Sequence, residues 1–327
     1  MKAIVYEDFG PPDILRCAEV EKPVPADHEI LIKVHAASVN PLDWKVMKGG
    51  PFLLRILLSR GKPKIKRPGA DVAGQVEAIG RHVTQFQPGD EVFGTCSGAF
   101  AEYATSASVP GMKSALVIKP PNVTFEQAAA APVAALTALQ ALRDKGRIQP
   151  GQHVLINGAA GGVGTFAVQL AKSFGAIVTA VSSTGNLDMV RSIGADRVID
   201  YTREDFTKSR QRYDLLLDCV GNHSLSEYRP ILNPKATLVM IGAPNDASMT
   251  SLVAGMLGAL VSSWFVSQKV AMFIAKSNPE DLTTIARLMA AGKITPVIDR
   301  RYPLCEAADA FRYMAQGHAR GKVILTN

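Results

Sequence analysis

The sequence is poor in cysteine. Only four of its 327 residues are cysteines, and they lie far apart with no C-x-x-C pair. That spacing excludes a ribbon-type zinc site and predicts no disulfide framework, which is typical of a reducing compartment. The four are Cys17, Cys96, Cys219 and Cys305.

Aromatic residues and clusters of positive charge are also scarce. Aromatics make up 6% of the chain, and the lysines and arginines behind the net charge of +7 are scattered along it. A nucleic-acid partner is therefore not expected, because a clustered basic face is missing. The excess charge predicts only a mild attraction for an anionic cofactor or a membrane surface.

No segment predicts a membrane-spanning helix. The uncharged, mostly apolar segment Leu252–Val266 is shorter than the roughly 20 residues that cross a bilayer. A buried helix or an apolar lid explains it best, and peripheral membrane contact stays open as an alternative. The chain begins directly with a strand pattern and no signal character, so a cytoplasmic location is expected.

The stretch Gln152–Ser182 contains the clearest motif. An apolar strand pattern, His153–Asn157, leads into the loop Gly158-Ala-Ala-Gly-Gly-Val-Gly164, and a helix pattern and a second apolar strand follow. Glycines at such a turn let the backbone approach a pyrophosphate, whose charge meets the helix N-terminus. Because the loop lies in the strand–loop–helix context that the motif requires, we interpret it as a dinucleotide-binding site.

Two domains are expected around this motif. Residues 1–122 carry short β-branched runs separated by turns, which favours a partly open barrel, and residues 276–327 are expected to return to that domain. Residues 123–275 start with an apolar helix, Phe125–Arg143, expected at the junction of the domains. Strands and helices then alternate, which predicts a doubly wound parallel sheet. The fold class is therefore α/β.

Several motifs together resemble the medium-chain dehydrogenase/reductase superfamily, and most closely its zinc-independent quinone oxidoreductase and enone reductase branch. That branch includes the zeta-crystallin-like and chloroplast-envelope quinone oxidoreductase types. The resemblance spans essentially the whole chain and implies a Rossmann domain, a discontinuous GroES-like domain and a homodimer formed through an edge strand. The motifs are Val39–Lys45, Pro68–Gly74, Gly89–Gly94, Gly98–Tyr103, Gly158–Gly164, Gly194–Tyr201 and Gly317–Lys322.

The resemblance also implies chemistry without a metal. Zinc-dependent relatives carry a Cys ligand where this chain has Asn40, and a Gly-His-Glu motif where it has Gly69-Ala70-Asp71. Reduction without a Lewis acid suits a quinone or an α,β-unsaturated carbonyl compound, because conjugation delocalises the arriving charge. We therefore expect hydride transfer from NADPH to such a small-molecule acceptor.

NADPH is favoured over NADH by a missing acid. An NAD-selective site offers Asp or Glu about 20 residues beyond the first glycine, but here the second strand ends in Ser182-Ser183-Thr184-Gly185-Asn186. Related sequences carry a lysine near position 185, so the cation that pairs a 2′-phosphate is not identified; Arg203 and Arg191 are candidates.

The resemblance carries site residues over by position. We expect catalytic roles for Asn40 as a donor to a carbonyl oxygen, for Lys45 as the group that stabilises the enolate or organises proton delivery, and for Asp43 as the residue that orients either of them. The expected cofactor contacts are Thr137, Gly158, Ala160, Gly161, Gly162, Val163, Gly164, Ser182, Ser183, Asn186, Tyr201, Cys219, Val220, Gly242, Ala243 and Lys322.

Two other functions stay open. The chain could bind NADPH as a redox sensor with little turnover, or act as a membrane-associated redox partner through Leu252–Val266. The histidines, His318 among them, show no metal-ligand spacing, and we expect no metal site.

Overall fold

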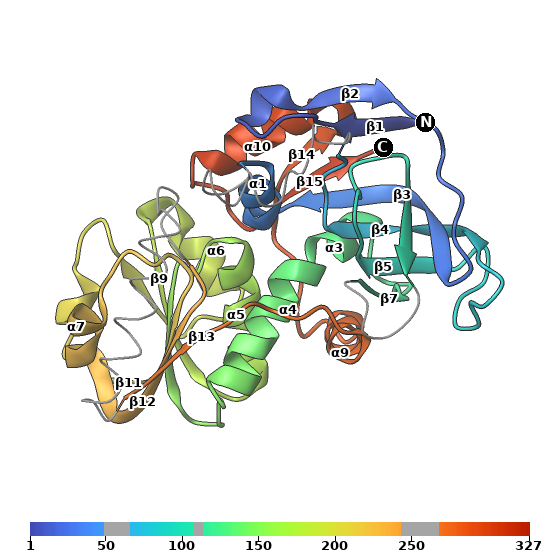
Figure 1. Cartoon of the computed structure of the whole chain (residues 1–327). Coiled ribbons are helices and arrows are strands. Elements are labelled where there is room, and N and C mark those ends of the chain that lie inside the picture. Colours follow the sequence, from blue (N-terminus) through green and yellow to red (C-terminus); the bar gives the residue numbers. More distant parts are fainter. Residues whose placement is uncertain (49–65, 108–113, 243–267) are drawn as a thin grey trace. The chain divides into compact units, whose positions relative to one another are not determined.

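The computed structural model describes residues 1–48, 66–107, 114–242 and 268–327, and its contacts divide the chain into two compact units (Figure 1). Unit 1 comprises Met1–Leu136, Lys276–Gly292 and Pro296–Asn327, and unit 2 comprises Thr137–Ala275 and Lys293–Thr295. Ala243 and the apolar segment Leu252–Val266 lie outside the described residues.

Unit 1 contains a seven-stranded sheet in the order β14-β15-β3-β4-β5-β7, with β6 paired to β3. Neighbouring strands are antiparallel except β14 and β15, which are parallel. A separate hairpin joins β1 and β2. The strands are β1 (Lys2–Val5), β2 (Arg16–Glu19), β3 (Glu29–Val39), β4 (Asp71–Ile79), β5 (Glu91–Thr95), β6 (Tyr103–Ala107), β7 (Ala115–Ile118), β14 (Ile298–Pro303) and β15 (Lys322–Thr326).

Apolar side chains on one face of these strands form the core of unit 1. On β3 the buried Ile32 and Val34 lie on either side of the exposed Lys33, as expected for a strand with one buried face. Phe100 and Phe311 meet edge to face in the same core. The helices of unit 1 are η1 (Pro12–Ile14), α1 (Pro41–Lys48), α3 (Phe125–Ala130), α9 (Pro279–Ala290), η6 (Leu304–Glu306) and α10 (Ala307–Ala315).

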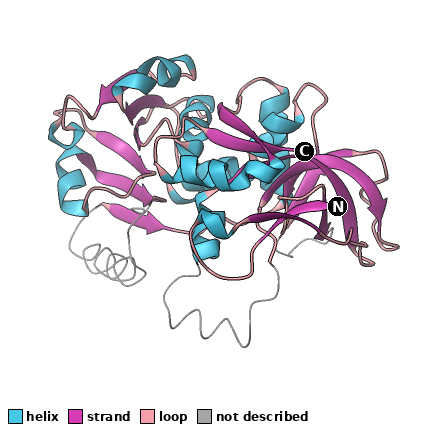
Figure 2. Ribbon diagram, turned by 90° about the horizontal axis from the view of Figure 1, so that it is seen from above, coloured by secondary structure: helices cyan, strands magenta, loops and turns pink. Residues whose placement is uncertain are grey.

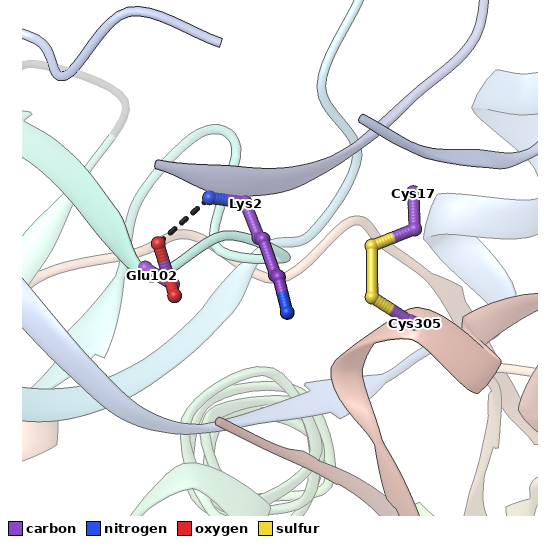
Figure 3. The surroundings of a disulfide bond; sticks show 4 residues. All are labelled: Lys2, Cys17, Glu102 and Cys305. Atoms are coloured by element: carbon purple, nitrogen blue, oxygen red, sulfur yellow. Dashed lines mark hydrogen bonds between the residues drawn. A yellow bond between two sulfur atoms is a disulfide. The ribbon is translucent and has the colours of Figure 1, made fainter. Parts of the chain in front are cut away.

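A disulfide joins Cys17 on β2 to Cys305 on η6, and both cysteines are exposed (Figure 3). The expectation of no disulfide is therefore wrong. The two cysteines are 288 positions apart in the sequence, and they meet because the C-terminal segment returns to the N-terminal hairpin. In the same view the backbone N–H of Lys2 donates to the carboxylate of Glu102, which joins β1 to the segment before β6.

Unit 2 contains a six-stranded parallel sheet in the order β10-β9-β8-β11-β12-β13. Numbered within the unit, this is the 3-2-1-4-5-6 order of a dinucleotide-binding fold, which confirms the predicted fold class. Figure 2 shows its strands with helices beside them. The strands are β8 (His153–Asn157), β9 (Ile177–Ser182), β10 (Arg197–Asp200), β11 (Tyr213–Asp218), β12 (Leu232–Met240) and β13 (Lys269–Met272).

The connections of unit 2 are short helices. They are α5 (Gly162–Ser173), η3 (Thr184–Asn186), α6 (Leu187–Ser192), η4 (Phe206–Lys208), α7 (Leu225–Tyr228) and η5 (Arg229–Ile231). Within the residues that the structure describes, no helix is both long and apolar enough to cross a membrane.

The apolar helix predicted over Phe125–Arg143 is divided into three pieces. A capping box formed by Thr124 and Gln127 starts α3, which ends at Ala130. Ala131 alone separates it from α4 (Pro132–Gln140). Pro132 has no N–H to continue a helical ladder, so it starts a new helix instead. A turn of π-helix, η2 (Ala141–Lys145), follows α4.

Candidate functional site

The glycine loop of unit 2 follows the central strand β8 and leads into α5 at Gly162. Gly158 has φ +80, a conformation that glycine adopts without steric cost. A Cβ on Gly164 would lie 2.1 Å from the carbonyl oxygen of Gly158, so this helix position must also be glycine. Both glycines are thus required by the backbone itself.

The same geometry forms a place for an anion. Gly161 caps α5 in an extended conformation, and the first N–H groups of a helix have no intrahelical partner. A Cβ on Gly161 would meet nothing closer than 3.5 Å, so the backbone here is open to approach. Gly162 and Val163 are the first residues of α5, and Ala160 precedes its cap. Free N–H groups at the start of a helix are suited to binding a pyrophosphate.

A polar network joins the carboxyl ends of β8 and β11. The side-chain amide of Asn157 donates to Asp218 Oδ1 at 3.0 Å and to the Tyr228 hydroxyl oxygen at 3.1 Å. Asp218 Oδ1 also accepts from the backbone N–H groups of Val220 and Gly221, both at 3.0 Å. These bonds fix the loop after β11 at the strand ends where ligands bind in such folds. The sequence analysis did not select Asn157 or Asp218.

One predicted contact next to this network, Gly242, leaves no room for a side chain. A Cβ on Gly242, which follows β12, would lie 2.2 Å from the carbonyl carbon of Cys219. Burial, followed by the charge of Asp218, raises the pKa of the Cys219 thiol, which keeps it protonated and unreactive. Thr137 is buried on α4, where unit 2 begins.

Four polar residues surround the end of β9. The hydroxyl of Ser182 and Oδ1 of Asn186 are buried and have no hydrogen-bond partner among the described residues. Asn186 donates through Nδ2 to the Ser183 hydroxyl oxygen at 3.1 Å, so the Ser183 proton is free to be donated elsewhere. Tyr201, on the next strand end, is 55% exposed, and its N–H binds the carbonyl of Ser182. Buried polar groups without partners mark a place for a polar ligand.

Unit 1 holds a buried polar cluster around Asp71, at the start of β4. Asp71 Oδ2 accepts from the Ser38 hydroxyl at 2.7 Å and from Nδ2 of Asn40 at 2.9 Å, and Oδ1 accepts from the N–H of Val133 at 2.9 Å. The ammonium of Lys322 lies 3.5 Å from Oδ2. Asp71 is fully buried, so these donors and the lysine charge compensate a carboxylate that is shielded from water.

Lys322 is a member of this cluster. Its Nζ donates to Asn40 Oδ1 at 2.5 Å, and only 4% of its side chain is exposed. Burial lowers the pKa of Lys322, an effect that the charges of Asp71 and Asp43 oppose. The structure thus brings Lys322, expected from resemblance as a cofactor contact, together with two of the three predicted catalytic residues.

Asp43 lies beside the cluster on the first turn of α1. Its Oδ2 accepts from the N–H of Asn40 at 2.9 Å, which is half of a capping box for α1. Burial, together with the charge of Asp71, raises the pKa of Asp43 to about 7. The carboxyl group therefore changes its protonation state near neutral pH.

The other two predicted catalytic residues differ in their surroundings. Both N–H groups of the Asn40 amide are donated inside the protein, to Asp71 and, at 3.2 Å, to the carbonyl of Ser38. With that assignment Asn40 has no amide proton left for a substrate carbonyl, and it acts instead on Lys322 through its oxygen. Lys45 is exposed on α1, outside the cluster. Ser38 was missed by the sequence analysis because nothing in its neighbouring residues marks it.

The ligand positions of zinc-dependent relatives carry no zinc ligands here. Asn40 and Ala70 replace a thiolate and an imidazole, and within residues 1–48, 66–107, 114–242 and 268–327 no three His, Cys, Asp or Glu side chains are grouped so that they could hold a metal. The residues present therefore do not fit a zinc ion at this position.

Two family models match the chain. The alcohol dehydrogenase GroES-like domain matches residues 26–141, and the zinc-binding dehydrogenase model matches residues 193–325.

The similar proteins cover the whole chain. A chloroplastic quinone-oxidoreductase homolog of Spinacia oleracea is 35% identical over 339 residues, which cover 99% of this chain and 98% of the relative. The chloroplastic NADPH-dependent alkenal/one oxidoreductase of Arabidopsis thaliana is 33% identical and covers 99% of this chain and 79% of the relative. The solved structure of the quinone oxidoreductase from Coxiella burnetii has a TM-score of 0.85 at 30% identity, covering 100% of this chain and 99% of that one.

The fold, the glycine loop and these matches define the class. The chain belongs to the medium-chain dehydrogenase/reductase superfamily, as the sequence analysis predicted. Within that superfamily its relatives include quinone oxidoreductase homologues that match over nearly their full length.

Proposed function

We propose that this protein is a zinc-independent, NADPH-dependent reductase of quinones or α,β-unsaturated carbonyl compounds. The observation that carries the proposal is the glycine loop between β8 and α5, next to a β9 end that has free hydroxyl donors and no acid on its own loop. The names of the spinach and Arabidopsis relatives support the same activity class.

The residues of unit 2 fit a dinucleotide. The start of α5 would hold the pyrophosphate, the loops after β11 and β12 would line the nicotinamide half, and Ser182, Ser183 and Asn186 would meet the adenosine ribose. A bound nicotinamide dinucleotide supplies the hydride for reduction. Here the chain's own task is to bind and orient, which the backbone requirements at Gly158 and Gly164 support.

The preference for NADPH rests on the end of β9. The Ser182 hydroxyl has no partner among the described residues, and the Ser183 hydroxyl retains its proton, so both can donate to phosphate oxygens. No Asp or Glu stands on β9 or its loop to accept from a ribose 2′-hydroxyl. Comparable kcat/KM values for NADH and NADPH would refute this preference.

The residues of the polar cluster would organise charge for the reduction. Asn40 orients the Lys322 ammonium through its amide oxygen, and Asp43 fixes the N–H of Asn40 at the start of α1. Lys45, whose ammonium is exposed, is the candidate for stabilising the oxyanion that develops on the acceptor. A conjugated acceptor requires less of this stabilisation than a simple ketone, because the charge spreads over the conjugated system.

The absence of metal ligands at positions 40 and 70 is the basis for proposing reduction without zinc. We further propose a homodimer formed through β13, one of the two edge strands of the unit 2 sheet as described. Light scattering coupled to size exclusion tests the dimer. The cytoplasmic location stays a prediction of the sequence.

The test of the proposed function is NADPH oxidation followed by absorbance with matched acceptors. We expect turnover with 1,4-benzoquinone or 2-cyclohexenone and little with cyclohexanone, which lacks the conjugated double bond. Lys45→Met should lower kcat/KM for the accepted compound while NADPH binding is retained. Absence of turnover on every quinone, enal and enone would reject the proposal, and tight NADPH binding without turnover would favour the redox-sensor alternative.

A further inference from the structure

The end of β10 carries a carboxylate next to the proposed adenosine site. Asp200 stands opposite Ser182 in the parallel register of β10 and β9. The loops that follow these two strands are also joined, because the hydroxyl oxygens of Thr184 and Thr202 lie 3.0 Å apart. An acid in this place could select NADH, if its oxygens were free to accept from ribose hydroxyls.

The oxygens of Asp200 are not free. Oδ1 accepts from the N–H of Thr202 at 3.0 Å and from its hydroxyl at 2.7 Å, and Oδ2 accepts from the Thr184 hydroxyl at 2.6 Å. The guanidinium Nε of Arg203 faces Oδ2 from 3.8 Å. A carboxylate offers about four lone-pair directions, and here hydrogen bonds from Thr184 and Thr202 occupy three of them.

This arrangement leaves Asp200 with little capacity to accept from a ribose hydroxyl. The bonds from Thr184 and Thr202 lower the pKa of Asp200, so the carboxylate stays charged at neutral pH. Each threonine hydroxyl has a single proton, and both protons are given to Asp200. The hydroxyls left for a ligand at this edge are therefore those of Ser182 and Ser183.

Arg203 is the cation that the site otherwise lacks. Gly185 provides no side chain, and Arg191 on α6 donates to Asp188 at 2.8 Å. The Arg203 side chain is 79% exposed and is held near Asp200 at a distance longer than a direct hydrogen bond. Its planar guanidinium can bind two phosphate oxygens at once, and this is a stronger interaction than the 3.8 Å contact with Asp200.

We propose that Arg203 is the specificity-determining cation for the 2′-phosphate of NADPH, kept at the end of β10 by an Asp200 carboxylate that already accepts three hydrogen bonds from the chain's own threonines. The assignment rests on the proposed function, since it names a residue of the same cofactor site. It explains how the site accepts a 2′-phosphate although Gly185 has no charge.

Binding of adenosine 2′,5′-bisphosphate and of AMP to the full-length protein, measured by calorimetry, tests the assignment without turnover. Arg203→Ala should weaken bisphosphate binding on the order of tenfold, because one charge-assisted phosphate contact is lost, and should leave AMP binding unchanged. Arg203→Lys should recover part of the loss. Arg191→Ala is the matched control and should leave both affinities unchanged. In kinetics, Arg203→Ala should raise KM for NADPH more than KM for NADH.

Two outcomes would overturn the assignment. Unchanged bisphosphate affinity in Arg203→Ala removes Arg203 from the site, and an equal loss for bisphosphate and AMP assigns it a structural role. A wild-type protein that binds the bisphosphate no better than AMP and uses NADH as well as NADPH would instead refute the NADPH preference itself, so the two failures are distinguishable.

Discussion

Asp43→Asn is expected to stabilise the protein increasingly as pH rises. Asp43 is 7% exposed, and burial is the main cause that raises its pKa to about 7. An Asn at this position keeps an oxygen that accepts from the N–H of Asn40 and removes the charge. The substitution therefore tests the cost of the buried charge and leaves the half capping box in place.

The magnitude follows from linkage. The folded protein holds the Asp43 proton more tightly than the unfolded chain, in which the pKa is the ordinary 3.8, so stability is lost as pH rises from about 4 to about 7. The full cost of ionisation comes to about 4 kcal/mol above pH 7. The helix dipole stabilises a charged Asp on the first turn of α1 by only about 0.3–1 kcal/mol, so the cost of burying the charge is the larger effect.

Urea unfolding followed by circular dichroism at pH 5, 6, 7 and 8 measures the effect. The free energy of unfolding of Asp43→Asn, relative to the wild type, should increase by about 2.5 kcal/mol between pH 5 and pH 8. Asp188→Asn, at an aspartate whose side chain is fully exposed, is the control and should show almost no change with pH. A pH-independent difference for Asp43→Asn, or a wild type that gains on the variant as pH rises, would refute the reasoning.

Three further predictions concern stability and binding. Cys17→Ser should lower the free energy of unfolding by about 2–4 kcal/mol, since the disulfide closes a loop of 288 positions, and dithiothreitol should weaken the wild type but not the variant. Gly164→Ala should lower the free energy of unfolding in urea by about 1–3 kcal/mol and weaken NADPH binding. Gly161→Ala is its control, and because the nearest atom to the added Cβ is 3.5 Å away, stability should stay nearly unchanged. Lys322→Met should lower the free energy of unfolding by about 3–5 kcal/mol in the same assay, because it leaves the buried carboxylate of Asp71 without its cation. Adding Asp71→Asn should recover part of that loss. Equal stability of Lys322→Met and the wild type would contradict the idea that Lys322 compensates the charge of Asp71.

Much of unit 2 could be predicted from the sequence because its signals are local. The loop Gly158–Gly164 lies between a strand and a helix within one short stretch, and the alternation of β and α segments sets a parallel sheet. The α/β class follows from that alternation, whereas the strand order is seen only in the structure. The division of the apolar helix near Pro132 could also have been read from the proline itself.

The contacts that were missed join residues far apart in the chain. Cys17 and Cys305 meet only because the C-terminal segment returns to the N-terminal hairpin, and spacing along the sequence carries no sign of this. The cluster around Asp71 likewise joins β3, β4, α4 and β15. Neither the role of Asp71 nor the donation of both Asn40 amide protons inside the protein could therefore be derived from neighbouring residues in the sequence.

The most direct test of the account is a single-turnover experiment. The enzyme saturated with NADPH is mixed anaerobically with 1,4-benzoquinone or 2-cyclohexenone, and the absorbance of NADPH is followed with and without deuterium at the transferred C4 position. We expect oxidation whose rate depends on the acceptor and is slower with the deuterated cofactor. NADPH that stays reduced in the presence of every such acceptor would contradict it.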